Sequence, residues 1–262
     1  MRTRRRLLVA NWKMTRTPSA AAALARAIAS IPRPGEVDFA IAPSFPALDR
    51  VGAALSGTAI ALAAQDVYVE KEGAFTGEVS ASMLKDAGVA LVLVGHSERR
   101  LLRGEREPEF ARKMERLAEQ ELAPVYCVGE TRAERDAGRT ADVLRNQLAA
   151  LDGFSAPPPG LVLAYEPVWA IGSGLPATPQ MAAEVHAHLR VEIAARFGPG
   201  VAASTRILYG GSVSPASAPG LFAEAEVDGG LVGNASLVAV NVAALLSAAA
   251  APMTPSAPAT RA

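Results

Sequence analysis

The chain has 262 residues, of which half are hydrophobic and a fifth are charged. These proportions are typical of a globular protein with a large core and exclude a mostly disordered chain. Lysine plus arginine and aspartate plus glutamate number 26 each, so the molecule as a whole has no broad attraction for nucleic acid or an acidic membrane surface. Its single cysteine, Cys127, excludes an internal disulfide framework and indicates a reducing compartment, which we expect to be the cytoplasm.

The chain opens with "MRTRRRLLVANWKM", an arginine-rich start followed by a short apolar stretch. The stretch is interrupted by Asn11 and Lys13, which makes it a poor signal peptide. No apolar run in the chain approaches the roughly 18 residues that span a bilayer. The arginines have no aromatic residues among them, so we expect a solvated tail rather than a nucleic-acid site.

Eight short apolar runs follow one another along the chain and alternate with longer helical patterns. Most show no alternation of polar and apolar residues, as is typical of parallel strands buried on both faces. Thr17 before Pro18 and Thr178 before Pro179 indicate helix starts, and Gly198 indicates a helix end. The predicted strands are residues 7–12, 38–43, 60–65, 90–95, 124–129, 161–166, 206–211 and 229–234.

Alternating strands and helices predict right-handed parallel crossovers, and eight such units close into a single-domain (β/α)8 barrel over residues 1–250. A doubly wound open sheet is the alternative, but the first strand is not followed by a GxGxxG turn. Residues 251–262, "APMTPSAPATRA", have the composition of a disordered tail.

Polar side chains gather at the carboxyl ends of five predicted strands, where barrel enzymes carry their catalytic groups. Taken singly, each has an ordinary structural explanation, but a cation, an imidazole, a carboxylate and two glycine-rich turns on one rim indicate a site. His186 and His188 are two apart on a predicted helix and diverge, so we interpret them as structural, and Cys127 as a packing residue of the fifth strand. The rim residues are Asn11 and Lys13, His96 in "GHSERR", Glu166, Gly210 to Ser212, and Gly233 with Asn234.

This set of groups predicts a particular chemistry. The glycine-rich turns after the last two strands offer backbone N–H groups for a phosphate. Lys13 offsets anionic charge, His96 and Asn11 donate hydrogen bonds to a substrate oxygen, and Glu166 is the carboxylate suited to a general base. We find no cofactor motif and no metal-binding cluster in the sequence. Proton abstraction next to a carbonyl, through an enediolate, fits these parts, and an aldose-ketose isomerase performs it.

The segment "AYEPVWAIGSG", residues 164–174, is apolar beyond what an exposed loop needs. An enediolate phosphate in water eliminates its phosphate, so a lid that excludes water protects the intermediate. Residues 168–171 would form this lid, with Pro167 at its entry and Gly172 and Gly174 at its exit; Gly172 would also lend an N–H to the phosphate. The alternative is an exposed apolar patch for a partner protein.

Seven motifs in order resemble those of the triosephosphate isomerase family, over roughly residues 7–246. They are "ANWKM", "GAFTGEVS", "VGHSERR", "YCVGET", "AYEPVWAIGSG", "YGGSV" and "LVGNASL". The resemblance implies the TIM barrel and the cofactor-independent interconversion of dihydroxyacetone phosphate and D-glyceraldehyde 3-phosphate in glycolysis and gluconeogenesis. The family is itself the standard example of a neutral histidine electrophile at a helix N-terminus and of a mobile lid, so for this chain both ideas come from the resemblance.

The resemblance also implies roles for individual residues. Lys13, His96 and Glu166 would be catalytic, with Glu98 beside them in a supporting role. Substrate would be bound by Asn11, Lys13, Gly172, Ser212, Gly233 and Asn234. Asn234 stands where the family commonly has a second glycine, and Thr15 replaces an asparagine that often follows "NWKM".

A homodimer is also implied by the resemblance. The loop of residues 68–80 would reach into the second subunit, with Thr76 as the contact at its tip and Phe75 in the interface. A long loop that carries Phe75 would otherwise expose apolar area, which favours the same interpretation. Glu78, Arg99 and Glu105 would brace this region.

Two other classes of function remain open from the sequence. Another phosphosugar barrel enzyme, such as an aldolase or a synthase, would share the phosphate loops but would need a Schiff-base lysine inside a strand or a second acid. A noncatalytic phosphate-binding barrel is expected to have lost Glu166 or His96, and both are present.

Overall fold

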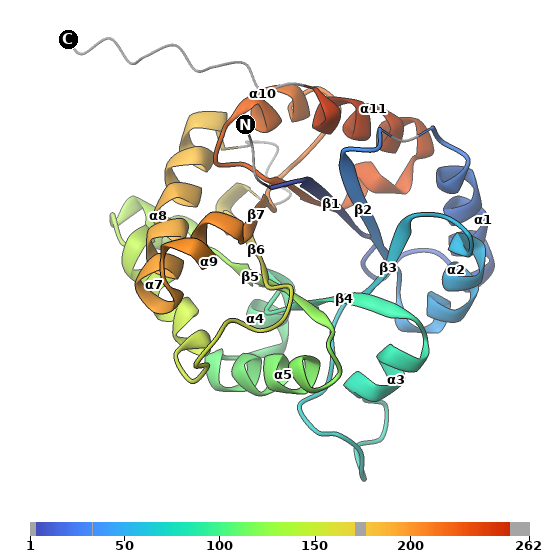
Figure 1. Cartoon of the computed structure of the whole chain (residues 1–262), viewed down its shortest axis with the longest axis horizontal. Coiled ribbons are helices and arrows are strands. Elements are labelled where there is room, and N and C mark those ends of the chain that lie inside the picture. Colours follow the sequence, from blue (N-terminus) through green and yellow to red (C-terminus); the bar gives the residue numbers. More distant parts are fainter. Residues whose placement is uncertain (1–3, 33, 171–176, 252–262) are drawn as a thin grey trace.

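The computed structural model describes residues 4–32, 34–170 and 177–251. Eight parallel strands form a closed barrel in which each strand pairs with the next along the chain and β8 returns to β1 (Figure 1). The predicted single-domain (β/α)8 barrel is therefore confirmed, and the open sheet is excluded. The strands are β1 (Arg6–Asn11), β2 (Val37–Ala42), β3 (Ile60–Ala64), β4 (Val89–Val94), β5 (Ala123–Val128), β6 (Val162–Tyr165), β7 (Arg206–Tyr209) and β8 (Gly229–Val232).

Helices surround the barrel on its outside (Figure 1). The two predicted helix starts are confirmed, since the hydroxyls of Thr17 and Thr178 accept hydrogen bonds from the backbone N–H three residues later. Gly198 ends α8 with a φ of 87°, a conformation that favours glycine. The helices are α1 (Pro18–Ala29), α2 (Leu48–Leu55), α3 (Ala81–Asp86), α4 (Ser97–Arg103), α5 (Glu107–Glu119), α6 (Arg132–Asp136), α7 (Thr140–Leu148), α8 (Pro179–Phe197), α9 (Pro199–Ser204), α10 (Ala218–Ala223) and α11 (Ala239–Ala250), with 3-10 turns η1 (Phe45–Ala47), η2 (Ala149–Leu151), η3 (Val168–Ala170) and η4 (Asn234–Leu237).

The strands are buried on both faces, as their unbroken apolar runs predict. Alternate residues of each strand point to the same face, so Leu7 and Val9 of β1 join an inner cluster that includes Cys127. Leu8 and Ala10 face the other way and pack in the cluster that also contains the buried faces of the helices. This double layer fixes the height and tilt of the strands, and thereby the positions of the residues at their ends.

The arginine-rich start corrects one expectation. Arg6 lies buried in β1, and its Nη1 donates to the carbonyls of Ala249 and Ala251 at 2.6 and 2.7 Å. Arg4 Nε lies 2.9 Å from Asp228 Oδ1. The expectation of a solvated tail is thus wrong for these residues, because their guanidinium groups find a buried carboxylate and helix-end carbonyls from the far end of the chain.

Two predicted segments fall wholly or partly outside the described residues. Gly172 and Gly174 of the expected lid lie there, as do residues 252–262 of the expected tail. None of the helices in the described part of the chain is long and apolar enough to cross a membrane.

His186 anchors α8 against the barrel. It is fully buried, its Nδ1 donates to the carbonyl of Glu226 at 3.0 Å, and its ring meets that of Tyr165 edge-on at 5.9 Å. Burial lowers the pKa of His186 from 6.5 to about 4. The structural role that the sequence predicts for this residue fits these contacts.

The pKa of His186 predicts a specific loss of stability in acid. Between pH 6.5 and about 4 the unfolded chain binds a proton that the folded chain does not, so stability is full above this window and falls as pH falls through it. We expect His186 to account for about 3 kcal/mol of the loss in unfolding free energy between pH ~7 and ~4. Urea denaturation of His186→Gln should show a correspondingly smaller loss.

The matched control is His188→Gln, two residues along the same helix, where the side chain is 29% exposed. This variant should lose stability in acid as the unmodified protein does. An equal acid loss in His186→Gln and His188→Gln would contradict the assignment.

Candidate active site

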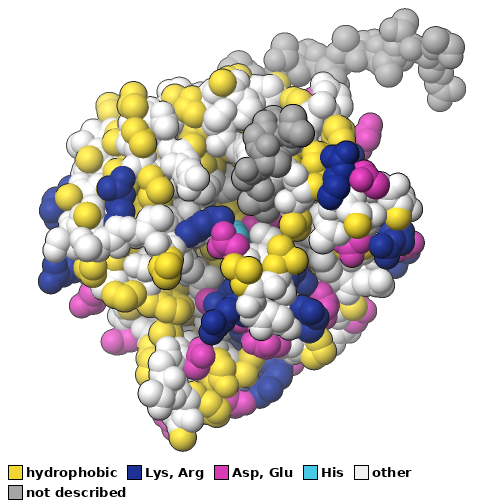
Figure 2. All heavy atoms as spheres, turned by 180° about the vertical axis from the view of Figure 1, so that it is seen from behind, with side chains coloured by type: hydrophobic (Ala, Val, Ile, Leu, Met, Phe, Trp, Pro, Cys, Tyr) yellow, Lys and Arg dark blue, Asp and Glu magenta, His cyan; other side chains and the backbone are white. Residues whose placement is uncertain are grey.

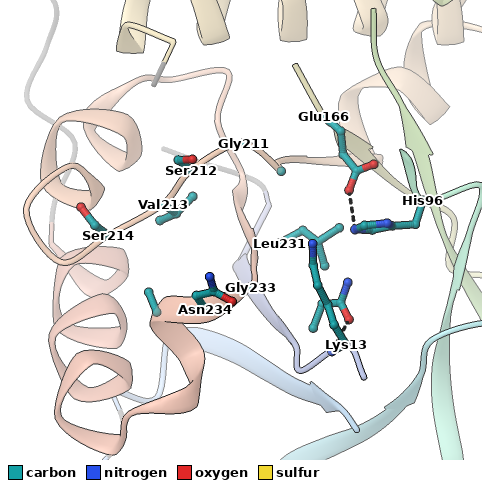
Figure 3. A pocket seen from close by; sticks show the side chains of 13 residues that line it. Lys13, His96, Glu166, Gly211, Ser212, Val213, Ser214, Leu231, Gly233 and Asn234 are labelled. Atoms are coloured by element: carbon teal, nitrogen blue, oxygen red, sulfur yellow. Dashed lines mark hydrogen bonds and ion pairs between the residues drawn. The ribbon is translucent and has the colours of Figure 1, made fainter. Parts of the chain in front are cut away.

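The carboxyl ends of β1, β4, β6, β7 and β8 meet around one cavity of about 360 Å³. Figure 3 shows Ser212 and Asn234 across this cavity from His96 and Glu166. Seen from the opposite side to Figure 1, basic, acidic and histidine side chains gather near the centre of this face (Figure 2). Of the residues predicted to bind or react, those that line the cavity are Asn11, Lys13, His96, Glu166, Ser212, Gly233 and Asn234. Gly172 lies outside the described residues.

Glu166 is the first residue after β6, and its side chain is buried, with 3% exposure. Its Oε2 accepts a hydrogen bond from the Ser97 N–H at 2.8 Å, and its Oε1 lies 3.1 Å from His96 Nε2. A buried carboxylate is costly without such partners, so the two contacts define where this group lies. They also join the ends of β4 and β6, which are not neighbours in the barrel.

His96 follows the end of β4 and caps α4. Its Nδ1 accepts a hydrogen bond from the Glu98 N–H at 3.2 Å, so this nitrogen carries no proton. Nε2 must then carry the proton of a neutral imidazole, and it donates to the Glu166 carboxylate. The geometry gives a neutral hydrogen-bond donor that faces the cavity.

Lys13 has a φ of 52°, which is unusual for a residue with a side chain. Its N–H donates to Asn11 Oδ1 at 3.1 Å, and its carbonyl accepts from Gln65 Nε2 at 2.9 Å. These two side chains hold the unusual backbone. The ammonium group is 2.6 Å from Glu98 Oε1, and a side chain at Gly233 would approach the Lys13 stem at 3.7 Å. The Lys13 side chain therefore extends from the loop after β8 to the carboxylate of Glu98.

The glycines after β7 are required by close packing. A Cβ atom on Gly210 would lie 2.8 Å from Glu166 Cγ, and one on Gly211 would lie 2.3 Å from the Tyr209 hydroxyl. Both distances are below any normal contact. The β7 loop thus comes close to the carboxylate while keeping its backbone toward the cavity.

The second candidate phosphate loop begins at Gly233, the residue that precedes η4. The first N–H groups of a helix have no partners within the helix, so those of η4 are available to an anion. In the β7 loop, the Ser212 hydroxyl donates to the Ala170 carbonyl at 2.8 Å. This contact joins the loop to the described beginning of the expected lid.

Cys127 lies inside the barrel near Glu166 but offers no second nucleophile. Burial, and then the negative charge of Glu166, raise the pKa of its thiol well above its usual value. The thiol stays protonated at neutral pH and packs in the inner cluster, as predicted.

The family model described as triosephosphate isomerase matches residues 6–249 of the chain. The chain is 48% identical over 254 residues to the triosephosphate isomerase of Paracidovorax citrulli (strain AAC00-1), covering 95% of this chain and 100% of that protein. It is 47% identical over 253 residues to that of Pseudomonas paraeruginosa (strain DSM 24068 / PA7), covering 94% and 99%. The chain belongs to the triosephosphate isomerase family. The resemblance drawn from the seven motifs is confirmed.

The two departures from the triosephosphate isomerase pattern have local explanations. Positive φ angles among described non-glycine residues occur at Lys13, Arg16 and Glu121. Asn234 therefore adopts a conformation open to any residue and needs no glycine. Thr15 donates its hydroxyl to the Trp12 carbonyl at 2.6 Å, so it closes the turn that carries Lys13.

A buried ionic network lies behind the site. Arg99 Nε donates to Glu105 Oε1 at 2.7 Å, and Lys113 Nζ joins Glu105 to Asp66 at 2.9 and 2.8 Å. Burial raises the pKa of Asp66, with Lys113 and Arg99 opposing it. At Glu105 burial acts in the same direction, but hydrogen bonds from Arg99 and Lys113 outweigh it and lower the pKa. The sequence singled out Arg99 and Glu105 but missed Asp66 and Lys113; this buried lysine is on α5 and does not line the cavity.

Sequence reasoning also missed three polar residues that hold the site. Gln65 follows the buried strand β3 and reaches Lys13, and Ser97 holds Glu166 through its backbone. Glu130, after β5, is fully buried, and its Oε1 accepts from Trp169 Nε1 at 3.0 Å. The position of Gln65 and Glu130 at strand ends was the available signal, but their partners come from distant segments.

Proposed function

We propose that this chain interconverts dihydroxyacetone phosphate and D-glyceraldehyde 3-phosphate, with Glu166 as the base that moves the proton. The observation that carries the proposal is the buried Glu166 carboxylate, held by His96 and Ser97 and facing two glycine-rich loops across one cavity. This arrangement supports phosphate binding at the loops and proton transfer at Glu166 within one cavity. The reaction is the isomerisation shared by glycolysis and gluconeogenesis.

The proposed mechanism moves protons only. Glu166 takes a proton from the carbon next to the substrate carbonyl, and the electrons of that C–H bond form an enediolate. His96 Nε2–H and Asn11 donate to its oxygens, and the Lys13 charge offsets the negative charge that develops. A proton then moves from the hydroxyl oxygen of the enediolate to the former carbonyl oxygen, and Glu166 returns its own proton to the neighbouring carbon, which gives the other triose phosphate. No electrons leave the substrate, so the step balances without a co-reactant.

The binding part of the mechanism falls to the two loops after β7 and β8. The backbone N–H groups around Ser212, Gly233 and Asn234 would hold the phosphate, with Gly172 as a further proposed contact. The apolar segment that follows Glu166 would exclude water while the enediolate exists. The contact between Ser212 and Ala170 supports this, because it links phosphate loop and lid directly.

Shortening the base tests the role of Glu166. Glu166→Asp withdraws the carboxylate by one methylene, and we expect kcat to fall by orders of magnitude with little change in KM. The measurement is a coupled assay with glyceraldehyde 3-phosphate. Glu184→Asp, on an exposed position of α8, is the matched control and should keep full activity. Unchanged turnover in Glu166→Asp would remove this residue from its role.

We also propose that two copies of the chain form a homodimer. The segment 68–80 projects away from the barrel between β3 and α3 (Figure 1). Thr76 is exposed on it, and Phe75 is 40% exposed while packing on Tyr68 at 4.9 Å. Exposed apolar side chains of this extent mark a surface for a partner. Those on the first four strand-to-helix connections and their helices are Met14, Phe75, Met83, Leu101 and Leu102.

A charge placed on this apolar surface should separate the dimer. Leu102 is 78% exposed near the end of α4, and we expect Leu102→Glu to shift the protein to monomer in sedimentation velocity and to lower activity before the barrel unfolds. The matched control is Val191→Glu, since Val191 is 66% exposed on α8, outside this surface. A fully active monomer, or an equal effect of both variants, would count against the proposed dimer.

For the place of action we propose the cytoplasm. The single cysteine is a free, buried thiol, and the fold uses no disulfide in the described part of the chain. Such cysteine usage fits a reducing compartment.

A further inference from the structure

The main chain of Glu166 rests directly on that of Gly129. Glu166 N–H donates to the Val128 carbonyl at 2.8 Å, which continues the β5–β6 pairing one residue beyond the strand. A Cβ atom on Gly129 would lie 1.7 Å from the Glu166 carbonyl oxygen, so no side chain fits there. The place of Glu166 therefore depends on where the Gly129 backbone lies.

One side chain holds both polar groups of Gly129. The Gly129 N–H donates to Gln147 Oε1 at 2.7 Å, and Gln147 Nε2 donates to the Gly129 carbonyl at 3.0 Å. Gly129 is buried, so these groups need partners, and a single amide supplies one acceptor and one donor. Gln147 belongs to α7, in the outer layer of helices. The helix layer thus reaches the edge of the site through this amide.

Gln147 is in turn connected to the segment that carries His96. Its carbonyl accepts from the Tyr126 hydroxyl at 2.5 Å, and Arg100 Nη2 donates to the same hydroxyl at 3.2 Å. Arg100 also donates to the carbonyls of Gly95 and Cys127 at 2.8 and 3.0 Å. Gly95 precedes His96, so one hydrogen-bonded frame supports the backbone beside both His96 and Glu166.

We propose that Gln147 is a positioning residue for the isomerisation, acting through Gly129 on the placement of the Glu166 carboxylate. This rests on the proposed role of Glu166 as the base. A base displaced by about 1 Å loses up to about 100-fold in rate. Binding should change little, because the phosphate loops follow β7 and β8 and make none of these contacts.

The first test removes the amide and keeps its length. In Gln147→Met we expect kcat to fall roughly 10- to 100-fold and KM to stay within about twofold. Asn146→Met makes the same replacement at the exposed neighbouring position and should leave both constants unchanged. Circular dichroism and urea denaturation verify that each variant is folded at the assay temperature. Normal kcat in folded Gln147→Met would overturn the proposal.

A second variant, Gln147→Glu, should change the pH dependence of kcat, which a general destabilisation of the fold would not do. A protonated carboxyl group has one donor and one acceptor, like the amide, whereas an ionised carboxylate has no donor for the Gly129 carbonyl. The kcat of Gln147→Glu, taken relative to the unmodified protein, should therefore rise as pH falls. The same ratio for Gln147→Met should stay flat. A ratio for Gln147→Glu that does not change with pH would contradict the proposal that both hydrogen bonds to Gly129 are needed.

A double-mutant cycle with Glu166→Asp separates the two proposals. If Gln147 acts by placing the carboxylate, its loss should cost much less kcat once that carboxylate is already withdrawn. Equal costs in both backgrounds would overturn the positioning role. Full turnover in Glu166→Asp alone would refute the proposed role of Glu166 as the base, whereas slow Glu166→Asp with normal Gln147→Met would refute only this inference.

Discussion

A single buried carboxylate shared between two strand ends is the constraint on which the site depends. Glu166 follows β6 into a buried position, where its two oxygens accept from the Ser97 N–H and the His96 Nε2–H at the end of β4. If both donors were absent, the buried Glu166 charge would be unpaired, which would cost several kcal/mol of folding free energy. The carboxylate is therefore held by groups that the closed barrel brings from another part of the chain, and it stays an acceptor that can take a proton.

Different strand ends of the barrel contribute different kinds of group to the site. The ends of β1, β4 and β6 carry Lys13, His96 and Glu166, while the loops after β7 and β8 present backbone. Glycines at 210 and 211 let the second group approach the first, because any side chain there would strike Glu166 or Tyr209. The helices outside the barrel also supply hydrogen bonds to the strand ends. Gln147 of α7 accepts one from Gly129, and Arg100 of α4 donates one to Gly95. The residues of the site are thus held by both layers of the fold.

The sequence was sufficient for the eight strands and for the residues of the rim, because unbroken apolar runs and strand-end polar residues follow from local pattern. It did not reveal Gln147, Gln65 or Glu130 as supports, since an isolated polar residue on a helix or after a strand looks like any solvated one. Arg4 and Arg6 were misjudged for the same reason: their partners, Asp228 and the carbonyls at the end of α11, are more than 200 residues away in the chain. Roles that depend on a partner from a distant segment require the fold.

The most direct test of this account is the protonation state of His96. The chain has three histidines, so nitrogen-15 NMR of the imidazole side chains gives few signals, and His96→Gln identifies the one of interest. At neutral pH we expect His96 to show an unprotonated Nδ1 and a protonated Nε2, as the hydrogen bonds from Glu98 N–H and to Glu166 require. A doubly protonated ring, or a proton on Nδ1 alone, would contradict the arrangement from which the mechanism is built.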